Sequence, residues 1–359
     1  MKLSDFIRVK MTAVLPMVVA VLALSSCGMV YEDEGDCNTY CDVLFVYDRN
    51  MEFADAFASK VEAVDLYVFD ADGKFLRQVS ERGDALKADG YRMPLDLQPG
   101  QYTVLAWCGL NGELDSYDVP EPTPGVTTLQ EMQCRLADRQ TTGGETVVGE
   151  IDNLFHGMTT FTLPDEEGRH TYTVELTKNT NNVRVVLQQN PKDDSEPLNS
   201  NDFVFTITDE NGLLDYDNSV LDDELLSYRP FYTAQGTASI NTDEDDDDAI
   251  TSVSTVLAEF TVSRLFKWED KNRGARLTIT KAKPEDDGTY KTVLSIPLVD
   301  VALLVKGYDN RDMDDQEYLD RQDEYNLIFL LDENGIWTSA QIIVNSWTVV
   351  YSETGLGSN

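Results

Sequence analysis

The sequence predicts an all-β protein made of two tandem antiparallel β-sandwich domains with short helical insertions. Runs of β-branched and aromatic residues recur along the chain with turn residues between them, and no sustained amphipathic helix interrupts them. At 359 residues, the chain is also longer than a single domain usually is. Together these two observations favour a pair of sandwiches over a doubly wound α/β sheet.

Residues 1–26 are predicted to be a secretory signal peptide. Basic residues open the chain, and an almost wholly apolar run at 11–24 follows, which is too short to span a bilayer comfortably. Small residues then lead to Cys27, so we expect cleavage between Ser26 and Cys27. Cys27 would carry the lipid, as S-diacylglycerol and N-palmitoyl groups. A plain signal peptide with a chance cysteine is the alternative.

Residues 27–40 are predicted to be a lipidated acidic tether. The formal charge of the whole chain is −37, which argues against a nucleic-acid partner because nothing basic could follow phosphates. An anionic body is also repelled by acidic lipid head groups. The lipid on Cys27 is therefore the expected attachment to the membrane, and two or more acyl chains are needed for it to be stable.

The first predicted domain covers residues 41–166. A strand is expected at 43–47, and one or two helical turns at 51–59 would place Phe53 and Phe57 on one face. The clearest element is a β-hairpin that turns at residues 70–73, where glycine supplies a positive φ.

A strand at residues 102–108 is expected to alternate between two faces, with residues 102, 104, 106 and 108 on the same one. Residues 117–125 contain three prolines and are predicted to be an exposed connector. Strands at 172–176 and 183–187 are expected to be joined by a turn at 178–182.

The second predicted domain covers residues 167–359 and repeats the turn chemistry of the first. Residues 65–76 and 203–214 align turn on turn, 139 residues apart (209 − 70), and a third similar turn lies at 332–335. This repeat places the domain boundary near residues 164–171. Further β-rich runs are expected at 253–266, 275–282, 289–296, 299–305 and 337–351.

The cysteines predict one disulfide among Cys37, Cys41 and Cys134, because an exported protein meets an oxidising compartment. Sequence alone leaves the pairing open. Cys108 is expected to be buried as a small apolar residue.

No metal or cofactor is predicted. The six acids at residues 243–248 could form a divalent-cation loop, but a solvated, self-repelling hairpin tip is favoured. Residues 309–315 are similar to a calcium loop, yet they lack its glycine and its later glutamate, so we expect a plain loop. His156 and His170 are too few and too far apart in the sequence for a zinc site.

Catalytic motifs are equally scarce, and we do not expect an enzyme. The sequence has no nucleophile elbow, phosphate-binding glycine loop or nucleotide fingerprint. Acidic pairs are so common that a glycosidase dyad stays open as a hypothesis.

Segments spread along the chain resemble the fimbrium-anchoring subunits of Bacteroidales, the lipoprotein family of the major and minor fimbriae, and are most similar to the minor-fimbrium anchor. None is specific by itself, but their order is. The acidic run at 243–248 is not part of the pattern. The matching segments are 45–51, 61–73, 97–107, 154–157, 176–183 and 344–350.

The resemblance implies two transthyretin-like β-sandwiches tethered to the outer membrane and exposed at the cell surface. It implies that such a protein holds the fimbrial shaft at its base and limits fimbrial length. The implied partners are the fimbrillin shaft subunit, accessory fimbrial subunits and the outer membrane, reached through the lipid on Cys27.

A surface glycan-binding lipoprotein with β-sandwich modules is the alternative function. Carbohydrate sites need exposed aromatic platforms, and the chain has four tryptophans. Two of them, Trp107 and Trp347, lie within strand patterns and are expected to be core residues. Trp268 and Trp337 stay open as sugar-binding candidates.

Overall fold

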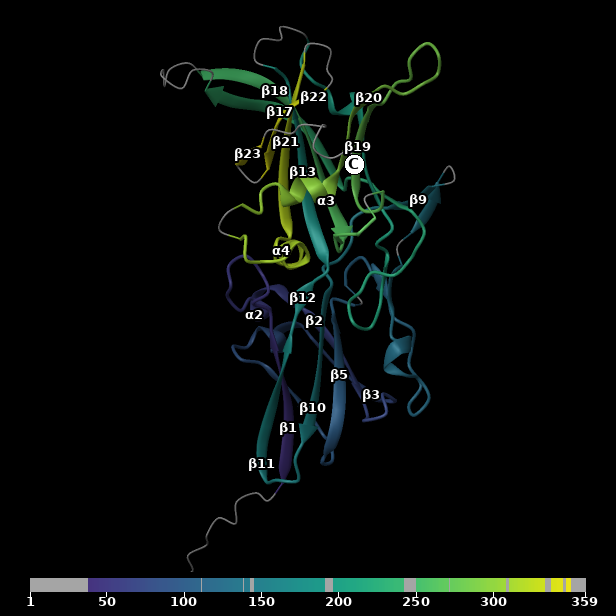
Figure 1. Cartoon of the computed structure of the whole chain (residues 1–359), viewed down its shortest axis with the longest axis vertical. Coiled ribbons are helices and arrows are strands. Elements are labelled where there is room, and N and C mark those ends of the chain that lie inside the picture. Colours follow the sequence, from purple (N-terminus) through teal and green to yellow (C-terminus); the bar gives the residue numbers. More distant parts are fainter. Residues whose placement is uncertain are drawn as a thin grey trace, which may run out of the picture.

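The computed structural model describes residues 38–349 apart from 111, 138, 143–144, 191–195, 242–249, 271, 308–309, 333–336 and 345–346. Within these residues most of the regular secondary structure is strand, and it is arranged in two lobes that follow one another along the long axis (Figure 1). The all-β prediction with β-sandwich domains and short helical insertions is confirmed.

The first lobe is a sandwich of two sheets. The smaller sheet has the order β11-β1-β4, and the larger one has the order β12-β10-β5-β2-β3. A short helix, α2 (Phe57–Lys60), follows β1. The strands are β1 (Thr39–Val46), β2 (Ala63–Phe69), β3 (Phe75–Arg82), β4 (Arg92–Leu95), β5 (Gly100–Cys108), β10 (Phe155–Leu163), β11 (Gly168–Glu175) and β12 (Thr177–Lys178).

The second lobe contains two six-stranded sheets, ordered β17-β18-β13-β21-β22-β23 and β20-β19-β14-β16-β9-β8. Two short helices, α3 (Leu298–Leu303) and α4 (Asp315–Arg321), lie beside them. The strands are β8 (Gln140–Thr142), β9 (Glu145–Val148), β13 (Thr180–Gln188), β14 (Phe203–Asp209), β16 (Leu226–Tyr228), β17 (Tyr232–Asn241), β18 (Ile250–Ser263), β19 (Arg276–Lys281), β20 (Thr292–Pro297), β21 (Glu324–Leu331), β22 (Trp337–Val344) and β23 (Trp347–Val349).

The two lobes exchange strands. β8 and β9 precede β10 in the sequence, yet they complete a sheet of the second lobe, where β9 runs parallel to β16. A small third sheet joins β15 (Leu213–Leu214) of the second lobe to β7 (Cys134–Leu136) and β6 (Tyr117–Asp118). Pulling the lobes apart would therefore break backbone ladders as well as side-chain contacts.

β5 shows how one strand serves two cores. Tyr102, Val104, Ala106 and Cys108 face the core of the first lobe, as the alternation predicted. The intervening side chains, including Trp107, face a second core that continues into the second lobe as far as Phe260 and Phe329. We call this second cluster the shared core.

Sheet pairing corrects the predicted boundary between the domains. β11 pairs in parallel with β1 along its whole length, so the boundary expected at residues 164–171 falls inside the first lobe. The expected turn at 178–182 is also wrong. The chain passes almost directly from β12 into β13, and Asn179 and Thr180 are buried there because their side chains bridge neighbouring segments.

Three further element predictions are wrong. Phe53 does not share a helical face with Phe57, because it has φ +52° and is 59% exposed, whereas Phe57 is buried. The apolar run at 299–305 forms α3 instead of a strand. After the repeated turn at 209–212, β15 pairs with β7 and not with β14, so this copy is not a hairpin, unlike the first copy between β2 and β3. The strands on either side of the third similar turn, β21 and β22, do pair antiparallel.

Candidate functional site

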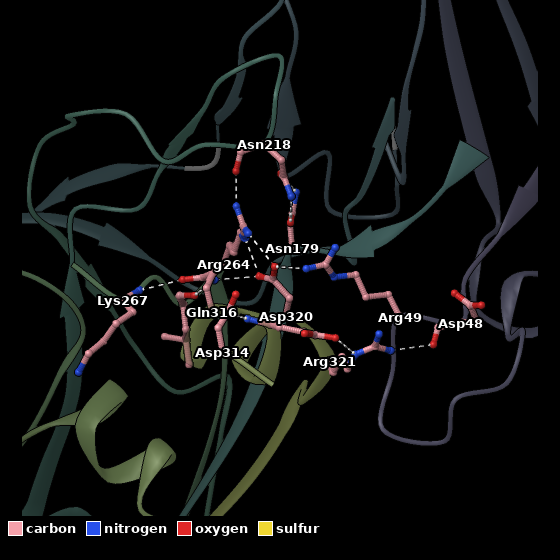
Figure 2. Close-up of polar contacts among 12 residues, drawn as sticks. Asp48, Arg49, Asn179, Asn218, Arg264, Lys267, Asp314, Gln316, Asp320 and Arg321 are labelled. Atoms are coloured by element: carbon pink, nitrogen blue, oxygen red, sulfur yellow. Dashed lines mark hydrogen bonds and ion pairs between the residues drawn. The ribbon is translucent and has the colours of Figure 1, made fainter. Parts of the chain in front are cut away.

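The region where the lobes meet, which we call the waist, contains a buried ionic network (Figure 2). At its centre Arg264 donates two hydrogen bonds to Asp320, from Nε to Oδ1 and from Nη2 to Oδ2, each at 2.8 Å. Both side chains are almost fully buried. Arg49 of the first lobe reaches the same carboxylate, with Nη2 3.4 Å from Oδ2. One carboxylate therefore holds arginines from both lobes.

Local structure positions Asp320. Asp314 caps the N-terminus of α4 by accepting a hydrogen bond from the backbone of Glu317 at 2.7 Å. In the first turn of α4, Gln316 donates to Oδ1 of Asp320, one turn further along, at 2.9 Å, and accepts from the backbone of Lys267 at 3.0 Å. Asp320 is thus fixed by its own helix before it meets the arginines.

Asn179 and Asn218 join the lobes with a pair of reciprocal amide hydrogen bonds. The two distances are 2.6 Å and 3.1 Å, and both side chains are buried. The backbone carbonyl of Asn218 also accepts a hydrogen bond from Arg264. Two polar systems, one neutral and one charged, therefore meet at a single residue.

Further contacts surround this centre. Lys178 lies 2.6 Å from Asp323, and Arg321 donates to the backbone carbonyl of Asp48 at 3.2 Å. His156 on β10 contacts the carbonyl of Tyr216 through Nε2 at 2.8 Å, so this nitrogen carries the proton. Burial lowers the pKa of His156 to about 4, which keeps the ring neutral at ordinary pH.

The contacts at the waist hold the two lobes together. Its charges are paired, its amides are bonded to one another, and the shared core continues beneath them. Within the described ranges, no three His, Cys, Asp or Glu side chains gather closely enough to hold a metal ion. Among all the residues that the structure describes, no helix is long and apolar enough to cross a membrane.

The predicted lipid and cleavage residues, Cys27 and Ser26, lie outside the described residues, as does Cys37. Cys41, Cys108 and Cys134 are free and buried. A bridge between Cys41 and Cys134 is contradicted, because Cys41 belongs to the first-lobe core and Cys134 to the shared core. Cys108 is fully buried, as expected for a small apolar side chain.

The histidines and tryptophans do not form a common site. His170 bonds the carbonyl of Glu166 at the surface, whereas His156 lies in the waist. Trp107 is fully buried, and Trp337 packs edge-on against Phe329. The side chain of Trp347 and the acidic run at 243–248 lie outside the described part of the structure.

Trp268 is already covered by a protein side chain. The guanidinium of Arg273 lies 3.7 Å from the centre of its ring, and Phe266 packs against it edge-on. Arg273 is held in turn by Glu210 and Asp222. A sugar could stack on the covered face only after displacing Arg273.

Sequence reasoning missed the ionic network. The available signal was a single arginine, Arg264, at the end of the long apolar run that forms β18. A charge in that position is costly unless it is paired. Its partners lie in segments 56 and 215 residues away in sequence (320 − 264 and 264 − 49), and no pattern in the chain links them.

The chain is similar to known fimbrial proteins. The model of the family described as Fimbrillin-A associated anchor proteins Mfa1 and Mfa2 matches residues 33–353. No curated protein matches the chain.

Solved structures agree with the family match. A candidate adhesin from Bacteroides thetaiotaomicron is 34% identical, with a TM-score of 0.72, covering 87% of this chain and 97% of that one. A candidate polysaccharide-binding protein from the same organism is 33% identical, with a TM-score of 0.71 and coverage of 88% and 99%. The fimbrial anchor protein Mfa2 of Porphyromonas gingivalis shares the fold at 18% identity, with a TM-score of 0.60 and coverage of 88% and 100%.

Proposed function

Because the chain belongs to the family of Fimbrillin-A associated anchor proteins Mfa1 and Mfa2, we propose that it holds fimbriae at their base on the outer membrane. The lipid on Cys27 is the proposed attachment, and the fimbrillin shaft subunit, with accessory fimbrial subunits, is the proposed partner. A subunit fixed by lipid ends the polymer that it joins. We therefore propose that it also limits fimbrial length.

The family match over residues 33–353 carries this proposal, because it spans both lobes instead of one common module. The waist is consistent with it. An anchor transmits force between its membrane attachment and its polymer, and paired charges, exchanged strands and a continuous core oppose separation of the lobes.

The short tether suits a membrane-proximal position. Only residues 28–38 separate Cys27 from Thr39, the first residue of β1. Fully extended, such a segment reaches at most about 40 Å. The first lobe would then stay close to the membrane. The second lobe follows it along the long axis of the molecule and would lie farther out (Figure 1).

The test uses a strain that lacks this gene, complemented with the wild type or with Cys27→Ala. Fimbriae are counted, and their lengths measured, on cells and in the medium. We expect long fimbriae in the medium of the deletion strain, rescued by the wild type but not by Cys27→Ala. Normal cell-bound fimbriae in all three strains would exclude the anchor function.

Glycan binding is the second candidate, favoured by the similarity to a candidate polysaccharide-binding protein. The arrangement of Trp107, Trp268 and Trp337 offers little support, because each ring is buried or covered by a neighbouring side chain. A pull-down with surface polysaccharides, run beside a pull-down with purified fimbrillin, separates the two functions.

A further inference from the structure

Natural sheet edges are usually protected against added strands, by charged side chains, proline, bulges or short length. Most edges in the described sheets follow this rule. β4 has four residues including Pro94, and β20 ends at Pro297 with a register shift against β19. Charged residues protect the two longest edges of the first lobe, namely Arg77, Glu81 and Arg82 on β3 and Arg169 and Glu175 on β11.

β17 is an exception. It has ten residues, Tyr232–Asn241, with neither a charged residue nor a proline among them. It pairs with β18 along its whole length in one continuous register. In an antiparallel pair, alternate backbone N–H and C=O groups of an edge strand point away from the partner. This edge therefore presents a long regular row of hydrogen-bonding groups.

The edge is also accessible. Tyr232 is 50% exposed, and Phe231, just before the strand, is 44% exposed. On the outer face of the sheet β17 carries the small residues Ala234, Gly236 and Ala238, which leave room for larger side chains on an added strand. In Figure 1 the far end of the β17–β18 hairpin projects from the body of the second lobe.

Acidic residues near the waist end of β17 favour a positively charged partner strand. A groove around Phe231 is lined by the exposed acids Glu62, Glu113 and Glu150. Lys60 lies at the same groove, and Arg184 is engaged with Glu259 at 2.9 Å. With a whole-chain charge of −37, this surface attracts a basic segment and repels a second copy of the chain.

We propose that β17 accepts an extended, net-cationic strand from a fimbrial subunit, as a seventh strand of the sheet that begins β17-β18-β13. Backbone hydrogen bonds to β17 provide the affinity. Basic residues of the incoming strand lie towards the acidic groove at Phe231 and set its direction. This assignment rests on the proposed anchor function and names the surface that performs it.

Photo-cross-linking locates the partner. The photoreactive residue p-benzoylphenylalanine replaces Tyr232 in fimbriated cells and, as the matched control, Tyr290, which is 57% exposed in the same lobe. We expect a cross-link to the shaft fimbrillin, identified with an antibody against it, from position 232 and none from position 290. A cross-link to a second copy, equal cross-linking at both positions or no cross-link at 232 would overturn the assignment.

Charge variants of β17 test whether the partner strand is positively charged. Ala234→Lys with Ala238→Lys adds positive charge beside the edge, and Ala234→Glu with Ala238→Glu is the size-matched control. We expect the lysine variant to lower capture of purified shaft fimbrillin about tenfold or more at low salt, with the glutamate variant close to wild type. Equal effects of the two variants would contradict a cationic partner strand.

The two proposals fail separately. Each variant protein is first checked for an unfolding midpoint equal to that of the wild type. The deletion strain complemented with the wild type is checked for fimbriae retained on its cells. Loss of the cross-link with fimbriae still held at the cell would reject only the β17 assignment. Failure of the Cys27→Ala experiment would reject the anchor function itself.

Discussion

The waist and the β17 edge differ in whether their polar groups are paired within the protein. At the waist, buried charges and amides are paired with groups from the other lobe, as Arg264 and Arg49 are with Asp320. At β17, a row of backbone groups faces outward beside exposed aromatic residues. At the waist these polar groups are bonded within the protein, whereas the outward backbone groups of β17 are the ones that we propose bind a partner strand.

In the proposed anchor, the waist has to keep the two lobes fixed to each other, and the β17 edge has to stay accessible to a partner. Desolvated pairs lose much stability when one member is removed, whereas exposed surface loses little. Substitutions at the waist should therefore change the folding of the protein, and substitutions at β17 should change only what it binds.

The largest effect is expected from Asp320→Ala. Removing this carboxylate leaves Arg264 buried without its partner, and such a change costs about 3–5 kcal/mol of unfolding free energy. Denaturant unfolding measures it. Asp84→Ala, which removes a fully exposed pair with Lys87, is the control and should leave the midpoint unchanged. Equal stability of the two variants would contradict a structural role for the network.

Two glycines provide a steric comparison. A Cβ on Gly109 would lie 1.9 Å from the carbonyl oxygen of Asn153, at φ +100°, whereas a Cβ on Gly236 meets nothing closer than 4.0 Å. We expect Gly109→Ala to cost about 2–4 kcal/mol and Gly236→Ala to stay within about 0.5 kcal/mol of wild type. Thermal unfolding of both variants tests this. A mild effect of Gly109→Ala would show that the backbone segments at Gly109 and Asn153 can move apart at little cost.

The pH dependence of stability reports on His156. Its pKa is about 4 in the folded protein, and an unfolded chain takes up the proton near pH 6.5. At this residue the unfolded state therefore binds more protons between these values, so the contribution of His156 to stability falls as the pH drops from 6.5 towards 4, by at most about 3 kcal/mol. Burial raises the pKa of Asp209 to about 7, so this carboxyl contributes in the opposite direction over the same range. The difference in unfolding free energy between the wild type and His156→Gln should therefore change across this range, and a difference independent of pH would contradict a titrating His156.

The smallest effect concerns the cysteines. Cys41, Cys108 and Cys134 are buried thiols, and burial raises the pKa of Cys41 to about 11. All three should resist iodoacetamide in the native protein and react without reductant after unfolding, as mass spectrometry would show. A Cys41–Cys134 disulfide peptide would contradict the structure.

Periodicity predicted the strands well because burial acts on neighbouring residues in a regular pattern. The alternation of residues 102–108 and the hairpin at 70–73 are local patterns, and both are confirmed. The exchange of β9 and β15 between lobes was not predictable, because it depends on pairing between segments far apart in sequence.

Local composition gave wrong predictions where side chains contact segments that are distant in the sequence. Residues 178–182 have the composition of a turn, yet Asn179 and Thr180 use their side chains to connect segments across the waist. The run at 299–305 is apolar enough for a buried strand or a buried helix, and periodicity alone does not separate the two. Asp320 is one of 65 acidic residues, and nothing in its sequence context marks it as buried.

The pairing of β1 has a mechanical consequence. β1 begins at the pole of the first lobe and lies along the long axis, hydrogen-bonded to β11 over all eight of its residues and to β4 on its other side (Figure 1). Tension applied at Thr39 along that axis would load both ladders in shear, so many hydrogen bonds would have to yield together. A pull across the sheet would instead open them one after another. Attachment through Cys27, as proposed above, would apply the drag on a fimbria in the direction in which β1 is hardest to extract.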